Sequence, residues 1–361
     1  MSSIRIKAKE RKGSVDVKTL MKHKMETGLR KGKDGKKIPE HWITDVTAES
    51  GGKVVFAAAF NTSISKDPYL AFKFEGKKGD TVKISWKDSK GKTDSAETKV
   101  KWLKGDSEMK KVISSALVGT LSLGIAFGVS AGPVEDQAAF QKYYENKFPD
   151  TPTADFANGV YSILPTAREQ WEAIEEFPPY EIAIEAGEAF YNKTFANGKS
   201  LADCFGPDGA VRNQYPKWDS DRGMVVTMEL AINECLTANG EKPLKYKKGK
   251  ITEVTAYMSF NSRGQEVDVK IPSDDPRALA AYENGKEHFY TKRGQLNFAC
   301  ADCHMLTAGN LYRADTTSPG FGHGTHWPVY RSKWQSMGTL HRRFGGCHKN
   351  IRANPYKAQG E

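Results

Sequence analysis

The first hundred residues alternate between apolar and polar positions, with the period of two that is typical of half-buried β-strands. Glycine- and lysine-rich turns, among them Gly51-Gly52, EGKKGD and KDSKGK, separate these runs. The apolar or alternating runs lie near residues 4–6, 54–60, 70–74, 82–86 and 100–102. About six short strands in such a length predict an all-β sandwich of the immunoglobulin type. No catalytic constellation is visible in this part of the chain.

Residues 180–361 contain an internal repeat. A Phe-Tyr pair stands 14 and 13 residues before Cys204, and another stands at the same distance before Cys303. The run LADCF in the first copy aligns with CADCH in the second, and each copy continues to a further cysteine, Cys235 or Cys347. The segments near 181–191 and 278–290 have amphipathic, helical patterns. The repeat therefore predicts two related, mainly α domains, each with a helix before its cysteine run.

Cys300, Cys303 and His304 form a Cys-x-x-Cys-His motif, the attachment signature of a c-type haem. In this motif the two thiols form thioether bonds to the porphyrin, and the histidine is an axial ligand of the iron. The alternatives are half of a zinc site, or a redox Cys-x-x-Cys with an unrelated histidine. A zinc site would want a second pair at matching spacing, which Cys347 and His348 do not provide. We predict one covalently attached haem c and a cytochrome c-like domain.

The first copy lacks this motif. Leu201 stands where Cys300 would attach haem, and Phe205 stands where His304 would bind iron. We therefore expect a degenerate cytochrome c-like domain without haem. Its two cysteines, Cys204 and Cys235, are either a disulfide or two free thiols. An oxidising compartment favours the disulfide, although pairing depends on a Cα separation that sequence does not give.

Cys347 is the remaining residue with the most specific functional interpretation. A lone cysteine after a haem motif is either a thiol without a function or the distal ligand of the iron. Arg342 and Arg343 precede it, and such charges would lower a thiol pKa and attract an oxyanion. Gly345-Gly346 would let the backbone approach the haem. The first copy has Ala231 at the position of Arg343, so it lacks this charge. The rival ligands are Met337 and His348; surface or loop roles are favoured for Met305, His323, His326 and His341.

The two parts of the chain differ in charge and in cysteine content. Residues 1–104 contain 25 Lys and Arg against 13 Asp and Glu, whereas the remainder contains 29 against 31. The lysines are spread over turns and strand faces, which favours a solvated surface or an acidic protein partner over nucleic acid. All five cysteines follow residue 203. Cysteine chemistry therefore belongs to the second part alone.

Residues 109–131, MKKVISSALVGTLSLGIAFGVSA, have the pattern of a secretory signal peptide. A methionine and two lysines precede an uncharged apolar stretch, which ends in the small-x-small sequence Val129-Ser130-Ala131. Residues 112–131 are also just long enough to span a bilayer. The many Gly, Ser and Ala residues, and the lack of a stop-transfer pattern, favour an exported segment. We expect residues 132–361 in the periplasm and leave the location of the first module open.

The N-terminal part resembles the SoxZ family in SIRIKAKERKG, HWITDVTAE and NTSISKDPYLAFKFEGKKGDTVKISWKDSKG. This resemblance covers residues 2–104. It implies a module that binds a SoxY-like carrier protein, whose cysteine bears the substrate, and that has no chemistry of its own.

The C-terminal part resembles the SoxA family, in its mono-haem type, from the signal segment to the end of the chain. The resemblance rests on CADCH, GHGTHWPVYRSKW and RRFGGC. It implies a haem-thiolate subunit in which Cys347 is an iron ligand and a catalytic persulfide, and in which Arg343 contacts substrate. The implied reaction joins thiosulfate to a SoxY cysteine and passes two electrons to a cytochrome c acceptor. A SoxX-like cytochrome subunit is the implied partner.

The predicted architecture is multidomain, and the whole chain is expected to be a fusion. A SoxZ-like β-sandwich (1–104) is followed by a linker with an internal signal (105–131), a degenerate cytochrome c-like domain (132–265) and a haem-binding cytochrome c domain (266–361). The last domain is expected to lack its closing helix, because only 14 residues follow Cys347. Two other functions stay open: an electron-transfer cytochrome without substrate chemistry, and a scaffold that only binds the carrier.

Overall fold

The computed structural model describes residues 2–11, 13–32, 34–102, 132–175, 177–312 and 315–358. The chain divides into two compact units, Met1–Gly124 and Ile125–Glu361. The linker and signal segment predicted at 105–131 lies outside the described residues. No helix among the described residues is long and apolar enough to cross a membrane.

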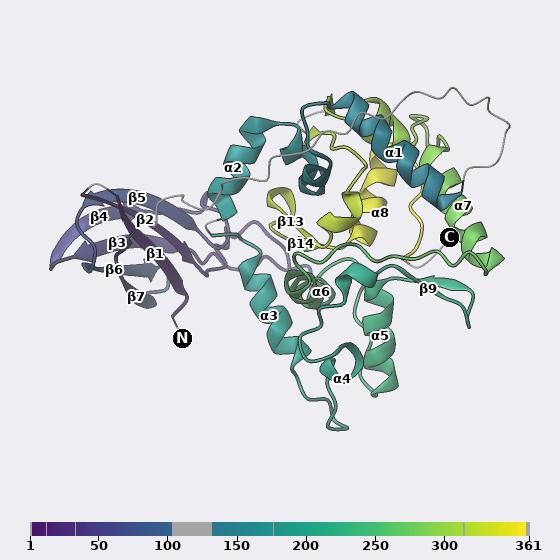
Figure 1. Ribbon diagram of the computed structural model, residues 1–361. Helices are drawn as coiled ribbons and strands as arrows, with labels where there is room; N and C mark the ends of the chain where they lie inside the picture. Colours follow the sequence, from purple (N-terminus) through teal and green to yellow (C-terminus); the bar gives the residue numbers. More distant parts are fainter. Residues whose placement is uncertain are drawn as a thin grey trace. The chain divides into compact units, whose positions relative to one another are not determined.

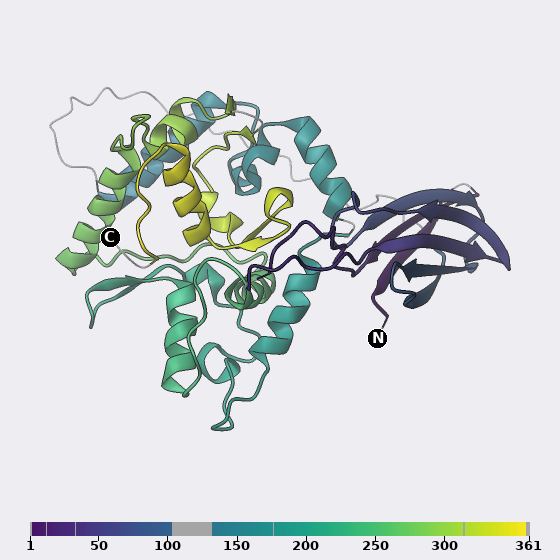
Figure 2. The same ribbon diagram turned by 180° about the vertical axis from the view of Figure 1, so that it is seen from behind.

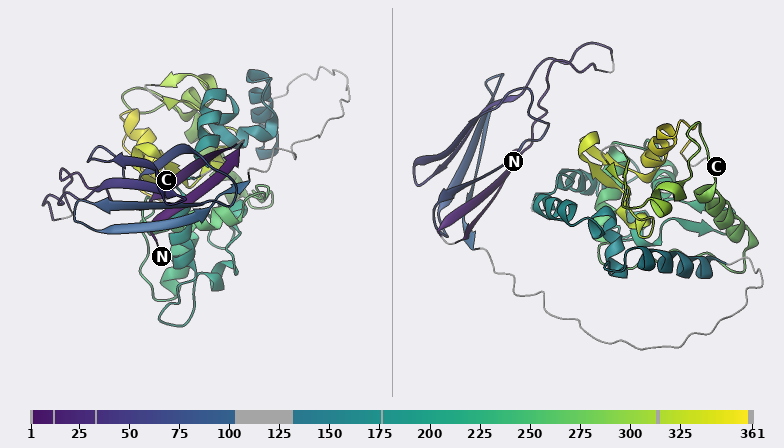
Figure 3. Two further views of the ribbon diagram at one scale, coloured as in Figure 1. Left: turned by 90° about the vertical axis from the view of Figure 1, so that its left-hand side faces the viewer. Right: turned by 90° about the horizontal axis from the view of Figure 1, so that it is seen from above.

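The N-terminal unit contains two four-stranded sheets (Figures 1 and 3). The first has the order β5-β2-β1-β8 and the second β4-β3-β6-β7. Neighbouring strands are antiparallel, except that β1 and β8 are parallel. The strands are β1 (Ile4–Arg11), β2 (Ser14–Met21), β3 (Ile43–Ser50), β4 (Lys53–Ala59), β5 (Tyr69–Glu75), β6 (Thr81–Asp88), β7 (Thr93–Lys99) and β8 (Lys101–Trp102). The predicted β-sandwich region is confirmed.

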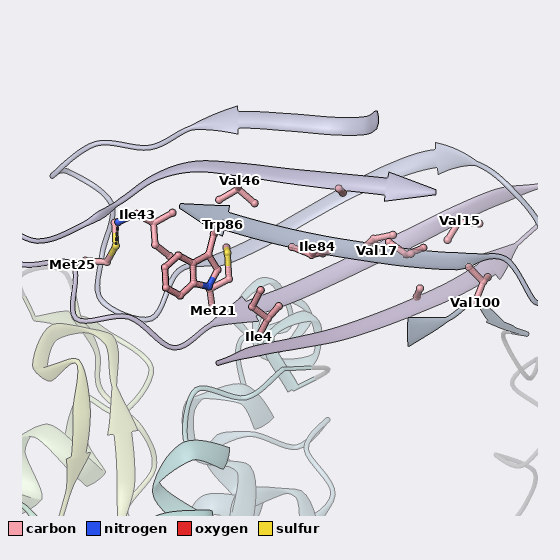
Figure 4. Packing of buried hydrophobic residues seen from close by; sticks show 13 residues of the cluster. Ile4, Val15, Val17, Met21, Met25, Ile43, Val46, Ile84, Trp86 and Val100 are labelled. Carbon is pink, nitrogen blue, oxygen red and sulfur yellow. Dashed lines mark hydrogen bonds between the residues drawn. The ribbon is translucent and has the colours of Figure 1, made fainter. Parts of the chain in front are cut away.

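The core of this unit follows from the alternation in its strands (Figure 4). On β6, Val82, Ile84 and Trp86 are buried, while the residues between them are largely exposed. The sequence analysis predicted neither β2 nor β3; for β3, the register explains why. A shift between Ile43 and Asp45 breaks the alternation, so that the buried side chains of β3 are not evenly spaced.

The C-terminal unit is mainly helical. Its helices are α1 (Pro133–Lys147), α2 (Pro165–Glu175), α3 (Glu181–Tyr191), α4 (Ala202–Phe205), α5 (Met228–Ala238), α6 (Lys250–Asn261), α7 (Pro276–Tyr290) and α8 (Leu340–Asn350). Three two-stranded ribbons pair β9 (Lys217–Asp219) with β10 (Met224–Val226), β11 (Leu311–Tyr312) with β12 (Asp315–Thr316), and β13 (Val329–Arg331) with β14 (Ser336–Gly338). The helices predicted near 181–191 and 278–290 correspond to α3 and α7.

The internal repeat is visible as a repeat of elements. The ends of α3 and α7 are 99 residues apart, as are Cys204 and Cys303. From β9 onwards the ribbon and the following helix recur as β13, β14 and α8 at a constant offset of 112 residues. The offset grows because the second copy has a longer loop, which contains β11 and β12. Cys235 and Cys347 therefore stand at the same position of equivalent helices.

Residues 140–163 pack against the second copy. Phe140, Tyr144 and Phe156 form a cluster with Met305 and Phe321. Helix α1 also lies beside α7 (Figures 1 and 2), since Lys286 of α7 bonds to Asp136 of α1 at 2.5 Å. The predicted domain at 132–265 therefore does not describe how this segment packs. Separate contacts hold the first copy together, where α6 packs beside α3.

Residues 351–358, which follow α8, are irregular and form no helix. The sequence analysis expected the second copy to lack a closing helix at this point. The first copy, in contrast, continues from α5 to α6. Helix α1 contacts the cysteine run of the second copy instead. The Tyr144 hydroxyl donates to the backbone carbonyl of His304 and accepts from the backbone N–H of Gly320 at 3.0 Å. Lys147 donates to the carbonyl of Met305 at 2.6 Å.

These contacts predict a stability difference between two neighbouring tyrosines. Tyr144→Phe removes a buried hydroxyl that bonds to both the His304 carbonyl and the Gly320 N–H. These two backbone groups also bond to each other at 2.9 Å and keep that bond, so the free energy of unfolding should fall by about 1 kcal/mol. Tyr143→Phe is the matched control. Its hydroxyl bonds only to the carbonyl of Met305, which also accepts from Lys147, so the loss should be smaller. Urea unfolding of both variants measures the difference; equal losses would contradict this account.

Candidate active site

The CADCH run, residues 300–304, begins a tight helical turn after α7. The side chain of Asp302 accepts from the backbone N–H of Ala299 at 2.8 Å and fixes the start of this turn. Cys300 and Cys303 are both half-buried, and neither is in a disulfide. Burial raises the pKa of both thiols. The run therefore presents two unpaired thiols on one turn.

One hydrogen bond fixes the orientation of His304. Its Nδ1 lies 3.0 Å from the backbone carbonyl oxygen of Ser318. Because a carbonyl can only accept, Nδ1 carries the proton and Nε2 keeps its lone pair. Burial lowers the pKa of His304, against the opposing effect of the Ser318 bond, and the nearby Arg343 lowers it further. The side chain is thus a neutral imidazole with one free ligand atom.

Two further histidines lie near this residue. The ring of His323 is 4.4 Å from that of His304, centroid to centroid, and its Nε2 lies 2.6 Å from Ser318 Oγ. Burial, followed by the neighbouring His304 and His326, lowers the pKa of His323 to about 2. His326 lies against Gly159, where a Cβ would approach its Cε1 to 2.5 Å. These contacts agree with packing roles.

The other candidate ligands have partners of their own. Met305 packs in the aromatic cluster with α1, and Met337 is buried on β14. His341 lies with Nε2 3.8 Å from Glu229 Oε2. His348 is buried, with its ring 5.6 Å from that of His288. Met305 and His341 thus make packing contacts, whereas the sequence led us to expect surface or loop positions for both.

Cys347 lies in helix α8 and faces the CADCH run. Its thiolate charge adds to the increase in pKa that burial causes at both Cys300 and Cys303, so its sulfur lies within electrostatic range of the two. The first copy gives independent support for this placement. There Cys235, at the equivalent helix position, is bonded to Cys204 with a Cα separation of 6.4 Å. The repeat therefore brings the later cysteine to the earlier cysteine run.

The two arginines before Cys347 differ in their surroundings. The Arg342 guanidinium lies 4.0 Å from the centre of the Trp334 ring and 3.2 Å from Ser336 Oγ. Arg343 is half-buried and has no hydrogen bond or ion pair within the described parts of the chain. Its charge opposes the increase in the pKa of Cys303 that burial causes, and adds to the decrease in the pKa of His304 that burial causes. Arg343 therefore has a guanidinium free to bind an anion beside the CADCH run.

Two family models match the chain. The model described as "Sulphur oxidation protein SoxZ" matches residues 4–99, and "SoxA/TsdA, cytochrome c domain" matches residues 185–267. The SoxA subunit of L-cysteine S-thiosulfotransferase from Allochromatium vinosum is 55% identical over 251 residues, covering 69% of this chain and 89% of that protein. Its counterpart from Chlorobaculum tepidum is 51% identical over 263 residues, covering 70% and 91%. The chain belongs to the SoxA family. Its N-terminal unit is a SoxZ domain, so the predicted fusion is confirmed.

A solved structure was also found, the crystal structure of SoxXA from P. pantotrophus. It is 33% identical in sequence and covers 51% of this chain and 69% of that chain, with a TM-score of 0.46.

The SoxA residues fit a haem c. A haem c is held by two thiols and by a histidine nitrogen, and here the two unpaired thiols of the CADCH run and Nε2 of His304 are suited to these roles. The bond from Nδ1 to Ser318 orients the imidazole, as is usual for a metal-ligating histidine. In the first SoxA copy these groups are missing. Leu201 is fully buried in the core there, and a disulfide joins Cys204 and Cys235.

The SoxZ domain contains a cluster that the sequence did not indicate. Asp88 Oδ2 lies 2.7 Å from His41 Nε2 and 3.6 Å from His23 Nε2. The three residues are far apart in the sequence and share no motif. The backbone N–H of Met25 donates to His23 Nδ1 at 3.2 Å, so the proton of a neutral His23 is on Nε2. His41 bonds to Asp88, whereas the buried Nε2 of His23 has no hydrogen-bond partner among the described residues.

The disulfide predicts a simple peptide map. Proteolysis of the haem-loaded protein without reductant should give one cross-linked peptide pair, containing Cys204 and Cys235, because these residues stand within bonding distance. Mass spectrometry before and after reduction measures it. A cross-link from either residue to Cys347 would contradict the structure.

Cys204→Ser with Cys235→Ser should lower the free energy of unfolding by about 2–4 kcal/mol.

Proposed function

We propose that this protein catalyses the oxidative conjugation of thiosulfate to a cysteine of a SoxY-like carrier protein. The observation that carries the proposal is the placement of Cys347 and Arg343 on one helix, both within electrostatic range of the CADCH run. A thiol for sulfur chemistry and a cation for an oxyanion thus lie beside the groups that fit a redox cofactor. The family membership of the chain supports the same reaction.

One haem c, attached covalently to Cys300 and Cys303 and held by His304 and Cys347, would supply electron acceptance at this site. The reaction forms a sulfur–sulfur bond between thiosulfate and the carrier thiolate. The reactants together carry three negative charges and the conjugate carries one, so two electrons must leave. A cytochrome c acceptor is the proposed destination of those electrons.

The side chains of the site have separate parts in this scheme. Arg343 binds the anionic oxygens of thiosulfate, because charge-assisted bonds from a guanidinium suit such groups. Cys347 is the catalytic residue, in the form of a persulfide. Its outer sulfur bonds to thiosulfate with loss of the two electrons, and the carrier thiolate then displaces it, so the persulfide is regenerated. Arg342 is held on Trp334 and keeps α8 in place against β14.

The proposed partners follow from the two parts of the chain. A SoxX-like cytochrome subunit would bind the SoxA part, and a SoxY-like carrier would bind the SoxZ domain. The SoxZ match over residues 4–99 supports the second interaction. If the chain stays uncleaved, the carrier would be tethered to the chain that modifies it; cleavage after Ala131 would separate the two parts.

Cys347→Ala tests the reaction. We expect loss of thiosulfate-dependent electron transfer to cytochrome c and a changed haem absorption spectrum, because both the catalytic sulfur and an iron ligand are removed. The assay contains the SoxX-like and SoxY-like partners. Unchanged turnover with an unchanged spectrum would show that Cys347 is neither the catalytic residue nor an iron ligand. Absence of thiosulfate turnover in the unaltered protein would favour an electron-transfer cytochrome.

Arg343→Ala should reduce kcat/KM for thiosulfate by about tenfold to a hundredfold, the range for one lost hydrogen bond to a charged group. The haem spectrum should be nearly unchanged. Arg342→Ala is the matched control, expected to lower thermal stability through its lost contact with Trp334 while changing KM less. Loss of haem in Arg343→Ala would show a structural role instead.

We further propose that the SoxA part is exported through residues 109–131 and acts in the periplasm. If the signal is cleaved after Ala131, the haem-bearing species should begin Gly132-Pro133-Val134. N-terminal sequencing of that species measures it. A haem-bearing species of full chain length in the membrane fraction would contradict cleavage.

A further inference from the structure

The loop that follows the CADCH run returns to His304 twice. The backbone carbonyl of Ser318 accepts from Nδ1 of the His304 ring at 3.0 Å, and the backbone N–H of Gly320 donates to the His304 carbonyl at 2.9 Å. Ser318 itself belongs to no helix or strand. The position of its carbonyl therefore depends on the side-chain and backbone contacts that hold this loop.

The side chain of His323 supplies one of these contacts. Its Nε2 lies 2.6 Å from Ser318 Oγ, and this is the one side-chain hydrogen bond of Ser318 within the described parts of the chain. The His323 ring also packs edge-on against the ring of His304, with centroids 4.4 Å apart. One side chain thus contacts both the ring of His304 and the residue whose carbonyl orients that ring.

The backbone around His323 is anchored on an earlier segment of the chain. His323 begins a short helical turn, His323–His326, directly after Gly322, where φ is +79°. A Cβ at Gly322 would lie 2.6 Å from the carbonyl oxygen of Phe156, so glycine permits this close approach. In the same turn, Thr325 Oγ1 donates to the carbonyl of Ala157 at 3.4 Å. The turn therefore has a fixed position from which the His323 ring reaches Ser318.

The haem-less copy lacks this histidine. Residues 211–216 and 323–328 align without a gap, at the offset of 112 residues, and both end in a proline. Each segment contains a short helical turn, Arg212–Gln214 in the first copy and His323–His326 in the second. Val211 stands at the position of His323, and its aliphatic side chain cannot form a hydrogen bond. The copy without the haem-binding groups thus also lacks the side chain that would hold such a loop.

We propose that His323 is a positioning residue, which holds the Ser318 carbonyl on Nδ1 of His304 and so tunes Nε2, the nitrogen that would bind iron. The inference rests on the haem ligation in the proposed function, and not on the chemistry of thiosulfate. A firm hydrogen bond from Nδ1 makes the imidazole a more basic ligand. A more basic ligand favours the oxidised iron, so the bond lowers the reduction potential of the haem.

His323→Phe tests the inference in the haem-loaded protein. Phenylalanine keeps an aromatic ring against His304 but removes the bond to Ser318. We expect the reduction potential to rise, so that the ratio of reduced to oxidised haem at a fixed potential increases by about threefold to tenfold, at or below the smallest effects of removing a direct partner of a ligand. Spectroelectrochemical titration measures this ratio. An unchanged potential would overturn the inference.

His323→Gln is the rescue variant. Its terminal amide can bond to Ser318 from the position of Nε2, although it has no ring, so most of the original potential should return. A shift equal to that of His323→Phe would overturn the inference, because the ring and not the hydrogen bond would then be responsible.

Ser318→Ala removes the same bond from the other side and keeps the carbonyl that His304 needs. Its shift should equal that of His323→Phe, and the double variant should shift no further than either single variant. Thr317→Val is the matched control. It removes a hydroxyl one residue away, which donates to the carbonyl of Thr307 at 2.7 Å, so it loosens the same loop without touching the bond of His323. Equal shifts in Thr317→Val and Ser318→Ala would overturn the inference.

Nuclear magnetic resonance of the reduced, haem-loaded protein reports on the bond itself. The Nδ1 proton of His304 should exchange with solvent faster in His323→Phe than in the unaltered protein, and equal rates would overturn the inference. Absence of haem from the unaltered protein would overturn both this inference and the proposed function. Shifted potentials in a protein that does not turn over thiosulfate would support the inference and overturn the proposed reaction alone.

Discussion

The hydrogen bond between His304 Nδ1 and the carbonyl of Ser318 is the constraint on which the site depends. It assigns the proton to one nitrogen and leaves the other free, so the imidazole has a single possible direction of ligation. The backbone of the same residue is held from the opposite side by Tyr144 of α1. Burial then keeps the ring neutral, since it lowers the pKa of His304. The proposed roles of Cys347 and Arg343 depend on where they lie relative to this fixed ring.

The repeat shows how one framework supports two outcomes. In the first copy a leucine in the core and a disulfide occupy the places of the haem-binding groups. In the second copy the equivalent cysteines are unpaired. Arg343 stands there at the position that Ala231 has in the first copy. Helix and ribbon positions recur between the copies, at an offset of 99 residues before the cysteine runs and of 112 residues from β9 onwards. The copies differ in a few side chains, in the longer loop that provides the Ser318 carbonyl, and in α6, which only the first copy has among the described residues.

Local patterns in the sequence predicted the parts of the structure that local chemistry controls. The alternation of Val82, Ile84 and Trp86 gave a strand, and the apolar period before each cysteine run gave α3 and α7. The spacing of CADCH predicted that two thiols and a histidine lie together, and the structure has them on one turn, unpaired. Long-range contacts could not be predicted in this way: α1 meets residues about 160 positions later. The break in β3 hid a strand, because a shifted register removes the period that reveals it.

The packing of α1 has a consequence for the order of folding. During synthesis α1 emerges long before the CADCH run, yet its buried tyrosine bonds to that run. A contact of such high sequence separation forms late, because a long loop must close first. Helix α1 must therefore stay undocked from the CADCH run until that run has been synthesised, so the buried face of α1 lacks its final partner for most of the synthesis of this unit.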